Sequence, residues 1–190
     1  MDRRAKGRAQ EQAQDPEQHA RNLCLRLLAG QPRTRAELAA HLGRKGVPDE
    51  AAEAVLSRFG EVGLIDDERF AEAWVTSRHA GRGLARGALA GELRRRGVDG
   101  ETVDAAVGQI DASTEEETAR SLVAKKWATI RHLPAQTQAR RLLALLARRG
   151  YPQAMSARVV RQVLEAADRP TEDRGWEAAQ ICDALDSLES

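Results

Sequence analysis

Hydrophobic residues recur along this chain at spacings of three and four, which place them on one face of a helix. Three glycines, Gly46, Gly97 and Gly150, mark the pattern and follow one another at intervals of 51 and 53 residues. Leucines stand four and eight positions before each glycine: Leu38 and Leu42, Leu89 and Leu93, and Leu142 and Leu146. A fixed period of this length indicates an array of similar units rather than one mixed core.

Boundary signals divide the first unit into three helices. Asp15 and Pro16 are the residue types preferred at a helix N-cap and at the first helical position, so a helix is predicted from there to Gly30. Thr34 begins a capping box ahead of the second helix, which ends at the first of the repeated glycines. Pro48 then begins a third helix.

The other two units carry similar signals. The second begins at Asp66, where acidic residues suit the positive end of a helix dipole. The third opens with a capping box from Ser113 to Glu116, and its later helices follow Pro134 and Pro152. Each unit is therefore predicted to contain three helices.

These elements predict an all-α protein of three tandem three-helix repeats that form an elongated, curved helical array. The expected order is a disordered arm at residues 1–14, repeats at 15–65, 66–111 and 112–168, and an acidic tail at 169–190. The tail has the pattern of an amphipathic helix, which could cap the array in the way that terminal elements of repeat proteins do.

Composition supports a helical core. Hydrophobic residues make up 42% of the chain and aromatic residues only 3%, so the core must consist mainly of Ala, Leu and Val. Trp74 and Trp127 stand 23 residues before their glycines, and we expect both to be buried. Cys24 and Cys182 lie far apart in sequence, which favours buried free thiols over a disulfide framework or a zinc site.

The sequence lacks the signals of a membrane or secreted protein and of a metal or nucleotide site. No stretch of ten residues is free of charge and the N-terminal segment has no apolar core, so we expect a cytoplasmic protein with neither membrane span nor secretory signal. The four histidines share no metal-ligand spacing, and no Walker-type phosphate loop is present. The glycine-rich stretch at residues 81–87 lacks a preceding strand and the dinucleotide-binding spacing. We therefore expect a non-enzyme without cofactor or metal.

Positive charge is concentrated in the expected third repeat. The whole chain carries a net charge of +1, but residues 112–168 carry +5 and residues 169–190 carry −4. Cations in the last turn of a helix also stabilise its dipole, so their position alone does not establish a binding role. The candidate contacts for a partner or polyanion are Arg78, Arg82, Arg94, Arg95, Arg96, Lys125, Lys126, Arg131, Arg140, Arg141, Arg148 and Arg149.

The few aromatic residues also limit how nucleic acid could bind. Base-stacking platforms on single strands need exposed aromatic rings, whereas Trp74 and Trp127 are expected to pack in the repeats. Any nucleic-acid contact should therefore be weak and directed mainly at phosphates.

Two stretches of the second and third repeats form a recognisable signature. One is Gly63-Leu-Ile-Asp-Asp-Glu-Arg-Phe-Ala-Glu-Ala-Trp74, followed by Arg78 and then by Glu-Leu-Arg-Arg-Arg-Gly-Val at residues 92–98. The other is Lys-Lys-Trp at residues 125–127 with Leu-Leu-Ala-Arg-Arg-Gly-Tyr at residues 145–151. Both resemble the signature of the RecX family, the regulators of the RecA recombinase. The resemblance covers roughly residues 17–166. Where the family tends to place Gly-x-x-Arg-Ile/Leu, this chain has Gly-Leu-Ala-Arg-Gly-Ala-Leu, which leaves the role of Arg86 open.

The resemblance implies three three-helix repeats that bind the RecA filament on single-stranded DNA, lie in its groove, and depress RecA ATPase, filament growth and strand exchange. A monomer is expected. Two alternatives stay open on the residues alone: a helix-turn-helix DNA-binding protein, and a helical scaffold for protein partners. The first would need a recognition helix rich in base-reading polar side chains, and none of the expected third helices is rich in them.

Overall fold

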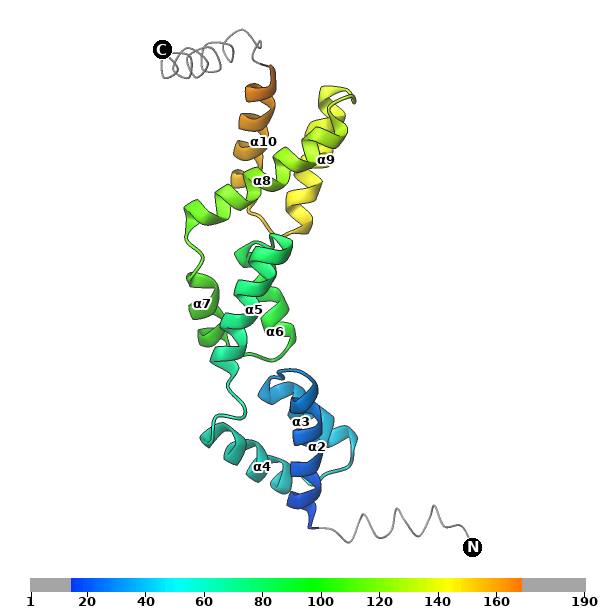
Figure 1. Ribbon diagram of the computed structural model, residues 1–190, viewed down its shortest axis with the longest axis vertical. Coiled ribbons are helices and arrows are strands. Elements are labelled where there is room, and N and C mark those ends of the chain that lie inside the picture. Colours follow the sequence, from blue (N-terminus) through cyan, green and yellow to red (C-terminus); the bar gives the residue numbers. More distant parts are fainter. Residues whose placement is uncertain (1–14, 169–190) are drawn as a thin grey trace, which may run out of the picture. The chain divides into compact units, whose positions relative to one another are not determined.

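The computed structural model describes residues 15–168, whose regular structure is entirely α-helical (Figure 1). The helices are α2 (Pro16–Gly30), α3 (Arg35–Arg44), α4 (Asp49–Glu61), α5 (Asp67–Arg82), α6 (Arg86–Arg95), α7 (Gly100–Gly108), α8 (Ala112–Ile130), α9 (Ala135–Arg148) and α10 (Gln153–Asp168). The predicted fold class of three tandem three-helix repeats is confirmed. The expected N-terminal arm, Cys182 and the expected capping helix lie outside the described residues.

The chain divides into two compact units, one ending at Glu115 and the other beginning at Glu116. Unit 1 contains α2–α4, called repeat 1 below, and α5–α7, called repeat 2. In repeat 1, α4 packs against α2 and α3, and in repeat 2, α7 packs against α5 and α6. Unit 2 contains most of repeat 3, which comprises α8–α10, and within it α9 packs against α10.

The same turn ends the middle helix of every repeat. Gly46, Gly97 and Gly150 have φ angles of 73°, 80° and 81°, a left-handed conformation that glycine adopts without steric cost. The residue after each glycine donates its N–H to the carbonyl of the second repeated leucine at 3.2 Å, as in a Schellman motif. All six repeated leucines are completely buried. The sequence period therefore corresponds to a repeated turn and a repeated core contact.

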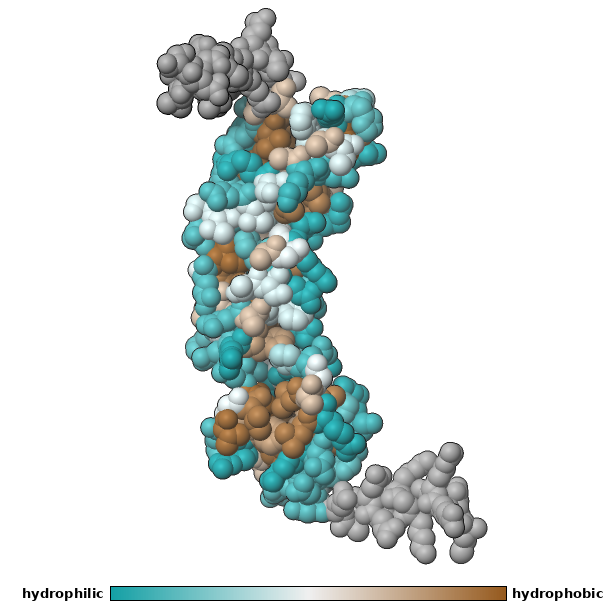
Figure 2. Space-filling view, viewed as in Figure 1, coloured by the Kyte–Doolittle hydropathy of each residue, from teal (hydrophilic) through white to brown (hydrophobic). Residues whose placement is uncertain are grey.

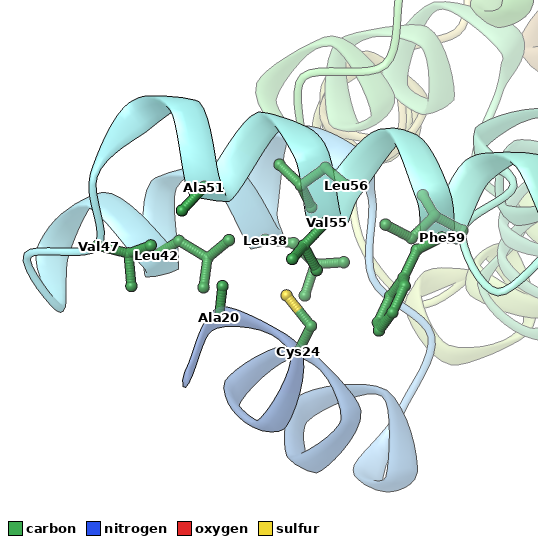
Figure 3. Packing of buried hydrophobic residues seen from close by; sticks show 10 residues of the cluster. Ala20, Cys24, Leu38, Leu42, Val47, Ala51, Val55, Leu56 and Phe59 are labelled. Carbon is green, nitrogen blue, oxygen red and sulfur yellow. The ribbon is translucent and has the colours of Figure 1, made fainter. Parts of the chain in front are cut away.

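Repeat 1 shows how small side chains fill such a core. Figure 3 shows Cys24 of α2 directed towards Leu38 of α3 and Val55 of α4. The Cys24 side chain is fully buried, and burial raises the pKa of its thiol above the usual value. The expected buried free thiol is confirmed for this cysteine.

Most of the predicted helix starts are capped as expected. Asp15, Thr34 and Asp66 each accept a hydrogen bond from a backbone N–H in the first turn of the helix that follows. The predicted cap of the third repeat was wrong by two residues, because Asp111 and not Ser113 caps α8. Its carboxylate accepts the N–H of Thr114 at 2.7 Å and the Ser113 hydroxyl at 2.6 Å. Hydrogen bonds from these residues lower the pKa of Asp111 to about 2.

None of the helices within residues 15–168 combines the length and the apolar character needed to cross a bilayer.

Candidate binding site between repeats 1 and 2

Repeats 1 and 2 are joined by a close polar contact at the N-terminus of α3. The buried Thr34 hydroxyl donates to the carbonyl of Arg96 at 2.7 Å while accepting the N–H of Glu37 at 3.1 Å. Nearby, the N–H of Arg35 donates to the Asp67 carboxylate at 2.9 Å. One acid of repeat 2 thereby satisfies a free backbone N–H at the start of a helix in repeat 1.

Backbone proximity strengthens this junction. A Cβ atom at Gly97 would lie 2.3 Å from the Cβ of Ala36, so no larger residue fits while α3 keeps its place. Partial burial is also the main cause that raises the pKa of Asp67 above its usual value, against the opposing effect of the hydrogen bond from Arg35. The two repeats are therefore closely packed at this junction within unit 1.

Arg96 links the two repeats through its side chain. Its guanidinium donates to the Glu37 carboxylate of repeat 1 at 2.6 Å. The same group lies over the Trp74 ring of repeat 2, with the guanidinium carbon 3.9 Å from the ring centroid. Such contacts are stronger when partly desolvated, and the Arg96 side chain is only 31% exposed. The Arg96 side chain therefore bridges repeats 1 and 2.

Trp74 is half-buried rather than fully buried, in contrast to the expectation from its repeat position. Its indole N–H donates to the Glu92 carboxylate at 2.8 Å. The guanidinium carbon of Arg78 lies 4.1 Å from the ring centroid, and the Phe70 ring stacks at a centroid distance of 5.7 Å. Two cations and a second ring therefore surround a tryptophan that still reaches the surface.

This tryptophan lies in the wall of a groove of about 880 Å³ between repeats 1 and 2, called the Trp74 groove below. Apolar side chains from both repeats line it, including Leu28 and Leu64 of repeat 1 and Phe70 of repeat 2. Figure 2 shows a continuous hydrophobic area on the surface of repeat 1, over α2 and α4. Leu64 contributes to the exposed apolar surface, since 49% of it remains accessible.

Five arginines line the Trp74 groove: Arg33, Arg69, Arg78, Arg82 and Arg96. Asp66 is the single acidic residue among the groove-lining residues, and its carboxylate is engaged in capping α5. Three of the five arginines were candidates from the sequence, but Arg33 and Arg69 were not. Arg69 stands within the acidic–aromatic stretch that carries the RecX resemblance, whereas Arg33 has no local signal, because only the packing of the two repeats brings it to the groove.

The other candidate cations of repeat 2 lie outside this groove. Arg94 pairs with the Asp104 carboxylate at 3.1 Å, with both side chains largely exposed, and Arg95 is exposed on the same helix turn. The structure also resolves the open question at Arg86. Its backbone N–H and its side-chain Nε donate to the Glu115 carboxylate at 2.8 Å and 3.0 Å. Since Glu115 is only 1% exposed, this arginine is the partner of a buried acid.

In repeat 3 most of the candidate cations lie on the exposed surface. Lys125, Lys126, Arg131, Arg140, Arg141 and Arg148 are all exposed, while Arg149 is half-buried. Trp127 is also half-buried, so the expectation of full burial is wrong here too. Its indole N–H donates to the side chain of Gln138 at 2.9 Å. The same amide donates to the carbonyls of Leu133 and Arg131, at 2.7 Å and 3.1 Å. A neutral amide therefore accepts the indole N–H in repeat 3, whereas a carboxylate accepts it in repeat 2.

Comparison with known proteins places these repeats in one family. Three models match in chain order: the first three-helix domain of RecX at residues 20–59, the second at 66–107 and the third at 114–160. The chain belongs to the RecX family. Within it, the Trp74 groove lies where the first and second three-helix domains meet.

Curated relatives and solved structures agree with this assignment. The regulatory protein RecX of Streptomyces coelicolor is 56% identical over 167 residues, covering 88% of this chain and 89% of that relative. The RecX of Thermobifida fusca is 56% identical, covering 82% and 86% of the two chains. The crystal structure of RecX from Lactobacillus salivarius matches 78% of this chain and 96% of its own with a TM-score of 0.71, at 18% identity, and therefore supports the fold.

Proposed function

We propose that this RecX-family protein binds the RecA filament on single-stranded DNA and inhibits RecA ATPase, filament growth and strand exchange. The match of all three RecX domains in order, and the relatives named regulatory protein RecX over most of the chain, support this proposal. In this role the protein acts as a monomer in the cytoplasm, in homologous recombination, DNA repair and the SOS response. It regulates without catalysis of its own.

Repeat 3 is the surface that we assign to phosphate contact. Its exposed cations give residues 112–168 a net charge of +5, and exposed lysines and arginines attract a phosphate backbone without reading its sequence. Trp127 is held by Gln138, so its ring is a poor platform for an unstacked base. Binding through this surface should therefore be weak, independent of sequence and sensitive to salt.

The primary test is the single-stranded-DNA-dependent ATP hydrolysis of the cognate RecA. Adding the protein in molar excess should lower the hydrolysis rate, and the protein alone should hydrolyse no ATP. Unchanged RecA turnover at saturating protein would overturn the proposal. A gel shift on random duplex run beside it tests the alternative of a DNA-binding protein, which predicts tighter binding to duplex than to the filament.

A charge-reversal variant tests the assignment to repeat 3. Changing Lys125, Lys126, Arg140 and Arg141 to Glu should weaken filament binding by at least about tenfold at low salt, with a smaller loss at high salt. The matched control reverses four exposed cations of repeat 1, Arg21, Arg26, Arg44 and Lys45, and so gives the same net charge. Equal losses in both variants would mean that net charge alone, and not repeat 3, determines binding.

A further inference from the structure

The Trp74 groove carries more positive charge than the described residues neutralise. Within residues 15–168, no carboxylate lies within ion-pair distance of the side chains of Arg69 or Arg78. The carboxylate of Asp66 is already engaged by a backbone N–H. In a groove with low-dielectric walls, such charges attract an anionic partner more strongly than they would on an open surface.

The groove is also apolar enough to bind side chains. Leu64 lines it with 49% of its surface exposed, and Phe70 and Trp74 form part of its wall. Its volume of about 880 Å³ lies within the range of ligand-binding pockets, roughly 300–1,000 Å³. A partner that offered negative charge alone would leave this apolar surface in contact with water.

The contacts of Trp74 favour a protein segment over nucleic acid. The Trp74 ring already has the guanidiniums of Arg78 and Arg96 within about 4 Å of its centroid, which leaves little of its face for a base. Acidic side chains interspersed with large apolar ones match both features of the groove.

We propose that the Trp74 groove is a docking site for a short acidic peptide segment of a partner protein, with apolar side chains against Leu64 and Phe70 and carboxylates at Arg69 and Arg78. This inference goes beyond the proposed function, because it concerns unit 1 and does not depend on RecA inhibition. The interaction is of the type in which acidic motifs are recognised by clustered arginines.

The test selects peptides from a random library on the full-length protein and measures the affinity of the consensus peptide by fluorescence anisotropy. Two groove variants, Arg69→Glu and Leu64→Ser, change exposed side chains and should leave helicity and melting temperature unchanged. Arg95→Glu and Leu143→Ser are matched controls, since both residues are exposed and lie outside the groove.

Selected peptides should combine acidic and large apolar residues. Arg69→Glu should weaken the consensus peptide about tenfold, since it replaces attraction with repulsion, and Leu64→Ser about fivefold, through lost apolar burial. Both control variants should bind within twofold of the parent protein. Peptides without acidic residues, no enrichment, or equal affinity in groove and control variants would overturn the proposal. The proposal would also be overturned if Arg69→Glu abolished the binding of a single-stranded oligodeoxynucleotide but left the binding of every peptide unchanged.

Discussion

Repeats 2 and 3 place a tryptophan at the same position of the same pattern, but give it different polar neighbours. Trp74 donates to a carboxylate and has two guanidiniums over its ring. Trp127 donates to the amide of Gln138, and within the described residues no cation stacks on it. The residue four positions later is an arginine in both repeats, yet only Arg78 lies over its tryptophan.

This contrast shows that the residues that form the repeated core and the residues that shape the surface vary separately. The common spacing of Trp, Leu and Gly in the two repeats gives the same buried leucine core, since both tryptophans stand 23 residues before their glycines. The polar neighbours then decide how the surface is used. In repeat 2 the Trp74 ring holds two cations in a groove, whereas the candidate cations of repeat 3 are mostly exposed to solvent.

The largest difference between the repeats should appear when each tryptophan is removed. Trp74→Ala should lower the free energy of unfolding by about 3 kcal/mol, as for other large-to-small changes in a partly buried site. Trp127→Ala should cost about 1 kcal/mol less, because it loses no cation–π contacts. Urea unfolding followed by circular dichroism measures both. An equal or larger loss for Trp127→Ala would contradict the comparison.

A smaller effect is expected at the bridging cation. Arg96→Met keeps an unbranched side chain over Trp74 but loses the cation–π contact and the ion pair to Glu37, at a cost of about 1–2 kcal/mol. A control change in repeat 3 is Arg131→Met, at the counterpart of Arg78, and it should alter stability by less than about 0.5 kcal/mol, since Arg131 is exposed. The same urea measurement tests both variants. An equal loss of unfolding free energy in Arg131→Met and Arg96→Met would show that the contacts of Arg96 with Trp74 and Glu37 add no specific stabilisation.

The repeated core could be predicted from sequence because its signals are local. Leu93 and Gly97, for example, lie within one helix and its turn, so spacing alone fixes their relation. The Trp74 groove could not be predicted in this way. Arg33 and Arg69 stand in different repeats and meet only because Thr34 and Gly97 dock the two repeats together.

The start of α8 illustrates a finer limit of sequence reasoning. Asp111 and Ser113 are both good N-cap residues two positions apart, so residue type alone does not decide where the helix begins. In the structure Asp111 caps the helix and the Ser113 hydroxyl donates to its carboxylate. Sequence therefore located this boundary to within two residues, and side-chain geometry fixed it.

The smallest effects are expected at two capping carboxylates whose pKa values move in opposite directions. At Asp67, partial burial raises the pKa above the ordinary value of 3.8, so the ionised group lowers the stability of the fold at neutral pH. Asp67→Asn removes this charge and keeps an acceptor for the N–H of Arg35. The variant should melt slightly higher than the parent protein at pH 6, and the gain should vanish below pH 3.8, where the parent carboxyl is protonated in both states.

At Asp111 the sign is reversed, since hydrogen bonds from Ser113 and Thr114 lower its pKa from 3.8 to about 2. The ionised carboxylate stabilises the fold above pH 3.8, and this contribution is lost as the pH falls towards 2. Asp111→Asn should therefore melt lower than the parent protein at pH 6 and approach it at the acidic end. Melting curves at pH 6, 4 and 3 measure both variants against the same parent. If both variants shifted the melting temperature in the same direction at pH 6, the two carboxylates would not have opposite effects on stability.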